Sequence, residues 1–116
     1  MVVDDLSGER VDRIFHALAD ATRRDIVRRA MDGELSVSDL ARGYDMSFAA
    51  VQKHVAVLEG AGLVAKRRRG RERLVRPDME TIHAARRLLD ELEALWRDRI
   101  DRIGDVLAGP DQGARP

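Results

Sequence analysis

The sequence predicts a mainly α-helical fold in which five helices accompany one two-stranded β-hairpin. Three observations support this: apolar residues recur at helical spacing over most of the chain, residues suited to N-caps precede three periodic segments, and a short stretch around Gly70 breaks the helical pattern. The 116 residues suit a single domain. The chain has no cysteine, which excludes disulfides and thiolate metal sites.

Two amphipathic helices are predicted at the start of the chain. The first has apolar residues at i, i+3, i+4 and i+7, namely Val11, Ile14, Phe15 and Leu18. The second begins after Asp20, a good N-cap, and ends near Gly33, where a C-cap favours a left-handed residue. Its inner face is expected to contain Ile26, Val27, Ala30 and Met31.

Two shorter helices follow, each introduced by a serine that can act as an N-cap. Ser36 precedes the first, with Asp39 three residues later in a variant of the capping box. Ser47 precedes the second, which extends to about Gly60. A short turn at residues 43–46 joins them, which gives the pair the proportions of a helix-turn-helix. The outward positions of the second helix are Phe48, Ala49, Gln52, Lys53 and Ala56.

A basic β-hairpin is predicted directly after this pair. Residues 63–65 and 74–75 have the composition of short strands, Gly70 suits the turn, and Pro77 ends the second strand. Residues 66–76 contain seven basic residues and one acid, Glu72, for a net charge of +6, although the whole chain is neutral. A hairpin in this position is the wing of a winged helix-turn-helix, and its charge indicates a nucleic-acid surface.

The last predicted helix covers about residues 79–107 and has an apolar stripe at alternating three- and four-residue steps. The stripe contains Ile82, Ala85, Leu89, Leu92, Trp96, Ile100, Ile103 and Leu107, and is widened by Leu88 and Leu95. The stripe could pack entirely within one chain. Its length favours burial against a second copy, together with the first helix. The residues expected in this dimer interface are Val11, Ile14, Phe15, Leu88, Leu89, Leu92, Leu95, Trp96, Ile100 and Ile103.

The expected organisation is a single winged helix-turn-helix domain over residues 9–108, with flexible ends at 1–8 and 109–116. No apolar run approaches the roughly 18 residues that a membrane span requires, and the first residues lack the pattern of a signal peptide. We therefore expect a cytoplasmic protein with no membrane partner.

Four segments resemble the ArsR/SmtB-type winged-helix regulators. They are LADATRRDIV (18–27), ELSVSDLA (34–41), SFAAVQKHVAVLEGAGLV (47–64) and RGRERLVRPD (69–78), in the order and spacing of that family. The resemblance implies a homodimer that binds an operator in double-stranded DNA and represses transcription. It also implies that a small-molecule inducer can lower DNA affinity.

The resemblance assigns the 47–60 helix to the major groove and the 63–77 wing to flanking DNA. Gln52 is the candidate base reader, because an amide can bond the edge of adenine bidentately, and Lys53 is a candidate phosphate contact. His54 lies nearer the inner stripe and is expected to be half-buried. The predicted recognition residues are Ser47, Phe48, Ala49, Gln52, Lys53 and His54, and the predicted wing contacts are Arg67, Arg68, Arg69, Arg71 and Arg73.

The sequence departs from the metal-sensing members of the family. Where those proteins have cysteines, this chain has Ser36 and Ser38, and hydroxyls are poor ligands for soft metals. The last helix has only His83 and Glu80 as potential ligands at its start, too few for a tetrahedral site. We therefore expect no metal, no cofactor and no enzymatic activity. The alternative function is a protein-interaction module, or an antitoxin-like accessory, that binds DNA weakly.

Overall fold

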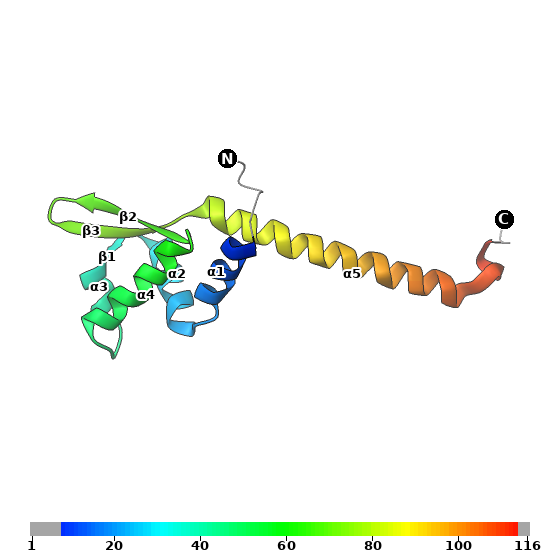
Figure 1. The fold of residues 1–116 in the computed structure, drawn as a ribbon, viewed down its shortest axis with the longest axis horizontal. Helices are drawn as coiled ribbons and strands as arrows, with labels where there is room; N and C mark the ends of the chain where they lie inside the picture. Colours follow the sequence, from blue (N-terminus) through cyan, green and yellow to red (C-terminus); the bar gives the residue numbers. More distant parts are fainter. Residues whose placement is uncertain (1–7, 114–116) are drawn as a thin grey trace. The chain divides into compact units, whose positions relative to one another are not determined.

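The computed structural model describes residues 8–113, which form five helices and three strands (Figure 1). Of the predicted flexible ends, 1–8 and 109–116, residues 1–7 and 114–116 lie outside the described residues, whereas Gly8 begins the first helix and residues 109–113 belong to the last. The elements are α1 (Gly8–Leu18), α2 (Ala21–Asp32), β1 (Leu35–Ser36), α3 (Val37–Arg42), α4 (Phe48–Gly60), β2 (Val64–Arg69), β3 (Glu72–Pro77) and α5 (Met79–Gly113). The chain divides into two compact units, one up to Ala85 and one from Arg86.

The three predicted N-caps are confirmed. Asp20 accepts a hydrogen bond from the backbone N–H of Arg23 at 3.0 Å, which begins α2. Ser36 and Ser47 begin α3 and α4 by accepting from the third residue of each segment, at 3.0 and 3.1 Å. Because these bonds satisfy backbone donors that have no partner within the helix, they fix where each helix starts.

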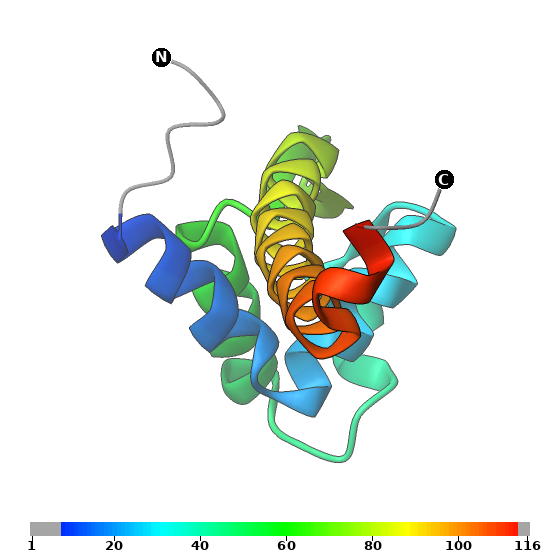
Figure 2. The ribbon, with the colours of Figure 1, turned by 90° about the vertical axis from the view of Figure 1, so that its right-hand side faces the viewer.

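The core of the first unit lies where α1, α2, α3 and α4 pack together and against the sheet. Figure 2 shows α1 crossing α4, and the two helices are in contact. The fully buried large side chains are Ile14, Ile26, Leu40, Val51, Val55, Leu58, Leu63 and Val75. Ile14 was predicted in the dimer interface. That prediction is wrong for this residue, because its side chain is 0% exposed within a single chain.

The sheet has three antiparallel strands in the order β1-β3-β2, one more than predicted. In β1, Leu35 pairs with Val75 and Ser36 with Leu74. Two residues are too few to produce a recognisable alternation, so β1 has no signal in the sequence. The β2–β3 hairpin turns at Gly70, as predicted, and the φ of this glycine is +62°, a left-handed conformation that glycine adopts without steric cost.

Two details of α2 differ from expectation. Gly33 follows the helix in an extended conformation, with φ 167° and ψ 155°, instead of a left-handed one. Met31 is 48% exposed instead of facing the core with Ile26, Val27 and Ala30. The position of Met31 at the last turn places it at the edge of the packed face.

Helix α5 continues beyond the predicted end near residue 107. Its regular helical conformation is interrupted at Gly109, where φ is +67°, and helical turns continue to Gly113. In the second unit, from Arg86, the apolar side chains on α5 are almost all exposed. Within the described residues, no helix is both long enough and apolar enough to cross a bilayer.

Candidate nucleic-acid interface

The first half of α4 presents an exposed face made of the residues predicted to lie in or beside the major groove. Ser47, Phe48, Ala49, Gln52 and Lys53 are all exposed, while the inner residues of the helix are buried. Phe48 keeps 46% of its surface exposed. An apolar ring and a neighbouring alanine are suited to contact the methyl group of thymine.

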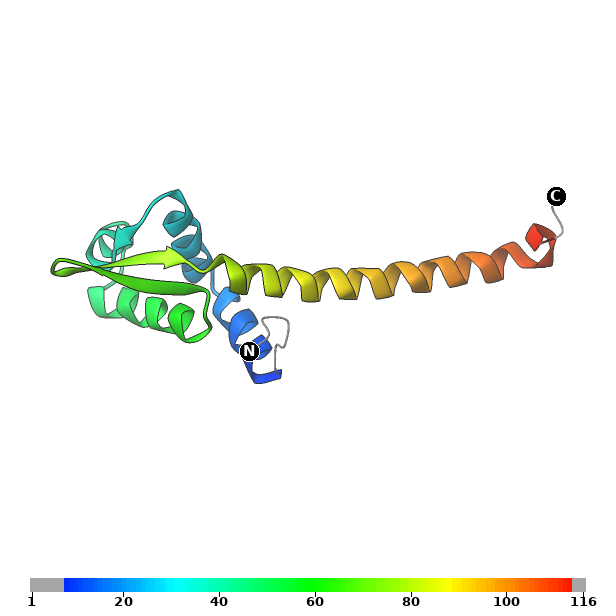
Figure 3. The same ribbon diagram turned by 90° about the horizontal axis from the view of Figure 1, so that it is seen from above.

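The β2–β3 hairpin carries a second exposed surface, at its tip. Arg69, Arg71 and Arg73 are exposed, and among the described residues no acid pairs with any of them. Arg68 donates from Nε to the carbonyl oxygen of Gly70 at 3.3 Å, which supports the turn. In Figures 1 and 3 the tip lies toward the same end of the first unit as the beginning of α4.

The net positive charge that the wing presents is smaller than its sequence indicates. Acids from other elements form ion pairs with two basic residues of β2, at the end of the hairpin away from the tip. Lys66 lies 3.6 Å from Glu59 of α4. Arg67 donates two hydrogen bonds to Glu34, from Nε at 3.0 Å and from Nη2 at 2.7 Å. Arg67 was predicted to contact DNA with the other wing arginines. Its contact with DNA stays a prediction, and in this structure its guanidinium is bound by Glu34.

A groove of about 270 Å³, here called the wing–helix groove, joins the two surfaces. Phe48 and Gln52 line it from α4, and Arg71 and Arg73 line it from the hairpin, and residues 36–38, Lys66 and Glu72 complete its lining. The fold therefore brings the candidate base reader and two of the predicted wing arginines to one groove. They are separated by about 20 residues of sequence, so only the tertiary fold could establish this proximity.

His54 is half-buried, as expected, and the structure identifies its partner. Nη1 of Arg23 lies 3.2 Å from Nδ1 of His54, and the same guanidinium donates to the carbonyl oxygens of Ala17 at 2.8 Å and His16 at 3.0 Å. Arg23 thus ties the last turn of α1 to α4. Sequence reasoning missed this residue, because an arginine on a polar helix face gives no signal of a distant partner.

The turn of the helix-turn-helix is attached to α2 through Tyr44. Its hydroxyl donates to Oδ2 of Asp25 at 2.6 Å, and the guanidinium of Arg29 lies 5.2 Å from its ring centroid. Burial raises the pKa of Tyr44, and the hydrogen bond to Asp25 raises it further. These contacts fix the turn that sets α3 and α4 relative to each other.

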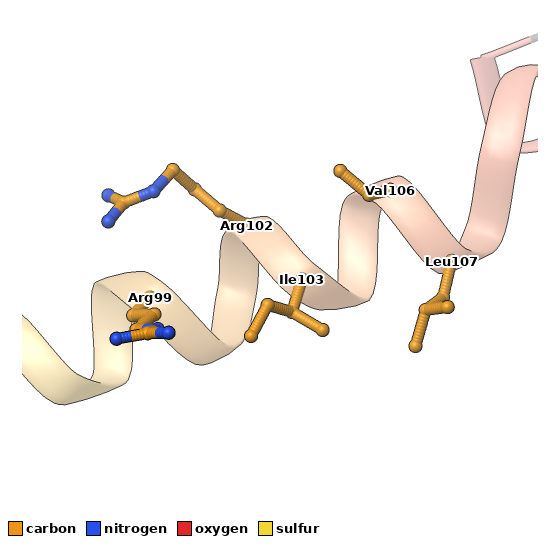
Figure 4. A pocket seen from close by; sticks show the side chains of 5 residues that line it. All are labelled: Arg99, Arg102, Ile103, Val106 and Leu107. Atoms are coloured by element: carbon orange, nitrogen blue, oxygen red, sulfur yellow. The ribbon is translucent and has the colours of Figure 1, made fainter.

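From Leu89 onward, the predicted dimer stripe is an exposed apolar surface on α5, whereas Ile82 and Ala85 pack in the core of the first unit. Leu92 is 54% exposed and Trp96 is 56% exposed, and Leu89, Leu95, Ile100 and Ile103 are comparably exposed. At the end of this surface, Ile103 and Leu107 project from one side of the helix, one turn apart, while Arg102 and Val106 project from another (Figure 4). Exposed apolar side chains on this scale are typical of a surface that binds another protein.

The positions at which related sensors have cysteines are used differently here. Ser36 is buried, and its hydroxyl oxygen accepts the capping hydrogen bond of α3. At the start of α5, Glu80 and His83 are exposed. Within residues 8–113, no three side chains of the metal-binding types are grouped together.

Comparisons with known proteins agree with this architecture. A helix-turn-helix domain family matches residues 18–67. The chain is 44% identical over 98 residues to the HTH-type transcriptional regulator Rv2034 of Mycobacterium tuberculosis, covering 81% of this chain and 92% of that protein. It is 32% identical to the arsenical resistance operon repressor of Escherichia coli, covering 82% and 80%. An ArsR-like transcriptional regulator from Rhodococcus sp. RHA1 superposes with a TM-score of 0.74 at 30% identity, covering 82% and 90%.

Proposed function

The chain belongs to the ArsR family of winged helix-turn-helix transcriptional regulators, and from this premise we propose that it is a homodimeric repressor that binds a palindromic operator. In this proposal α4 enters the major groove and the wing tip contacts flanking DNA. The observation that carries it is the wing–helix groove, where Gln52 of α4 lies with Arg71 and Arg73 of the hairpin. In this proposal the protein acts on operator DNA in the cytoplasm and catalyses no reaction.

The residues have two roles in this proposal. Gln52 reads a base through its amide, with Phe48 and Ala49 contacting thymine methyl groups beside it. Arg69, Arg71 and Arg73 neutralise phosphates or enter the minor groove. Ser47 keeps a hydroxyl hydrogen to donate, Lys53 contributes charge at the edge of the helix, and Arg68 supports the turn.

Two copies of the chain complete the site. The exposed stripe of α5 is the surface we assign to dimerisation, with Val11 and Phe15 of α1, which are half-buried, as secondary contributors. A two-fold dimer places its two recognition helices in successive major grooves, about 34 Å apart, and so requires a palindromic operator.

The test compares two variants on DNA selected from random duplexes and on a scrambled duplex, at several salt concentrations. Arg71→Ala should weaken binding to both and reduce the salt slope by about one for each lost phosphate contact. Gln52→Ala should leave the slope unchanged and cost about 1–3 kcal/mol on selected DNA only. Arg28→Ala is the matched arginine control, because Arg28 is exposed on α2 and pairs with Asp25.

The outcomes separate this function from the alternative. If Arg71→Ala and Gln52→Ala change DNA affinity and the salt slope in the same way, the two residues do not have the separate roles of phosphate contact and base reader. Weak binding with no salt dependence in the unmodified protein would favour the protein-interaction module.

A further inference from the structure

A second groove lies beside the wing, on the side of α2. It measures about 570 Å³ and is lined by Met31 from α2, Glu34 before β1, Arg67 and Arg76 from the hairpin, and Pro77 and Met79 after it. We call it the Met31–Met79 groove. Its volume lies within the range of pockets that hold small molecules.

The apolar part of this groove is exposed without a protein partner. Among the described residues of the first unit, the large apolar side chains with the greatest exposure are Met31 at 48%, Met79 at 45% and Phe48 at 46%. Phe48 belongs to the proposed DNA surface, and both methionines line this one groove. Methionine is flexible and polarisable, and so suits a surface that adapts to an apolar ligand.

The polar part of the groove has an excess of positive charge. Two arginines, Arg67 and Arg76, face one acid, Glu34. Glu34 accepts both hydrogen bonds of Arg67, and Arg76 is close enough to help lower the pKa of Glu34. No acid among the described residues forms an ion pair with Arg76. One positive charge therefore remains for a ligand.

The two grooves lie mainly on opposite faces of the hairpin strands. Arg67 pairs with Leu74, and Arg76 pairs with Ala65, so the two arginines are diagonal neighbours on one face. Lys66 and Arg73 project from the other face, which lines the wing–helix groove. In Figure 3 the hairpin lies between α2 and α4. Arg67 lies on the same hairpin that presents the wing arginines. A change in the hydrogen bonds of Arg67 therefore acts on this hairpin.

We propose that the Met31–Met79 groove binds a small monoanionic amphiphile, a carboxylate with an apolar body, whose carboxylate engages Arg76 and competes with Glu34 for Arg67. The apolar body lies against Met31, Met79 and Pro77. Binding releases the wing from Glu34 and lowers DNA affinity. This regulatory consequence rests on the proposed function, whereas the binding itself does not.

Binding is tested on the full chain without DNA, by NMR of the methionine methyl groups. The probes are octanoate and phenylbutanoate, below their aggregation concentrations, with octanol and phenylbutanol as neutral counterparts. The signals of Met31 and Met79 should shift to saturation with the carboxylates and remain in place with the alcohols. Met46, which is partly buried against the core, should not respond.

Two exposed residues give variants with opposite expected effects. Arg76→Gln should weaken carboxylate binding about tenfold, as expected for the loss of one charge-assisted hydrogen bond. Glu34→Gln should strengthen it, because the competing carboxylate is gone. A purely structural role of these residues would not produce changes of opposite sign.

The proposal is overturned if neither carboxylate shifts Met31 and Met79, if the alcohols bind equally well, or if Met46 shifts in parallel. It is also overturned if the shifts follow protein concentration instead of the probe, since a second copy is then the occupant. Saturating octanoate should lower the DNA affinity of the unmodified chain and leave Arg76→Gln unaffected. Binding without this effect would refute the regulatory role, and a chain that binds octanoate but no DNA would refute only the proposed function.

Discussion

Arg23 of α2 and His54 of α4 are joined by a contact of 3.2 Å between Nη1 and Nδ1. Arginine has no acceptor atom, so Nδ1 of His54 accepts this hydrogen bond and the ring proton of the neutral histidine lies on Nε2. The same guanidinium bonds two carbonyl oxygens at the end of α1. One side chain thus sets the position of α4 relative to α1 and the tautomer of a residue on the recognition helix.

Replacing Arg23 should therefore destabilise the protein more than replacing an ordinary surface arginine. We expect Arg23→Ala to lower the free energy of unfolding by about 1.5–3 kcal/mol, the range for hydrogen bonds to charged groups. Arg28→Ala should change it by about 0.5 kcal/mol or less, because Arg28 forms only an exposed ion pair. Urea denaturation measures both, and a double-mutant cycle with His54→Ala isolates the direct contact. Equal effects of the two arginine variants would contradict the assigned role of Arg23.

The stripe on α5 should be sensitive to charge, and the opposite face of the same helix should not. Leu92→Asp places a carboxylate in the proposed dimer interface. An unpaired buried charge there costs about 3–5 kcal/mol. Ala94→Asp adds the same group on the polar face and should leave the dimer intact. Sedimentation of the two variants decides the assignment, and a folded Leu92→Asp dimer would remove the stripe from the interface.

Tyr44 should make stability fall at alkaline pH. Burial and Asp25 raise its pKa above the ordinary value of 10, so its contribution is complete below that value and is lost as the pH rises through the raised pKa. Tyr44→Phe should cost about 1 kcal/mol near neutrality and flatten this alkaline decline. Tyr44 is the only tyrosine, so ultraviolet absorbance reports its ionisation directly. A decline that is equally steep in Tyr44→Phe would assign it to other groups.

Soft metals should leave DNA binding unchanged. Ser36 and Ser38 offer hydroxyls where thiolates would be required, and Ser36 already caps α3. Zinc, cadmium or arsenite at stoichiometric concentration should not alter the affinity for selected DNA. A loss of about tenfold, or 1.4 kcal/mol, would direct attention to Glu80 and His83.

Local features of this fold could be predicted from the sequence, and long-range contacts could not. The caps at Asp20, Ser36 and Ser47 depend on a residue and its third neighbour, and all three are confirmed. The partners of Arg67 and His54 lie 33 and 31 residues away, and no periodicity indicates such pairs.

The exposed faces of the helices could be predicted from helical spacing. The sequence did not indicate which other helix covers a given apolar face. Ile14 follows the same period as Val11 and Phe15, yet it belongs to the core while the other two remain half-buried. Similarly, the run of basic residues predicted a cationic wing. The pairing of Lys66 and Arg67 with acids of other elements became evident only in the folded chain.

Between residues 89 and 107, apolar residues of α5 are eleven positions apart, as in Leu89 with Ile100, Leu92 with Ile103, and Trp96 with Leu107, while Ile82, Leu89, Trp96 and Ile103 are seven apart. Eleven residues correspond to about 3.67 residues per turn and seven to about 3.5, and both lie close to the roughly 3.6 of a straight helix, so the stripe stays on one side of α5 along its length. The helix can therefore gain or lose eleven residues without rotating its contact face. A single inserted residue would rotate the part of α5 beyond it by about 100°, so the two parts of the apolar stripe would no longer face the same side.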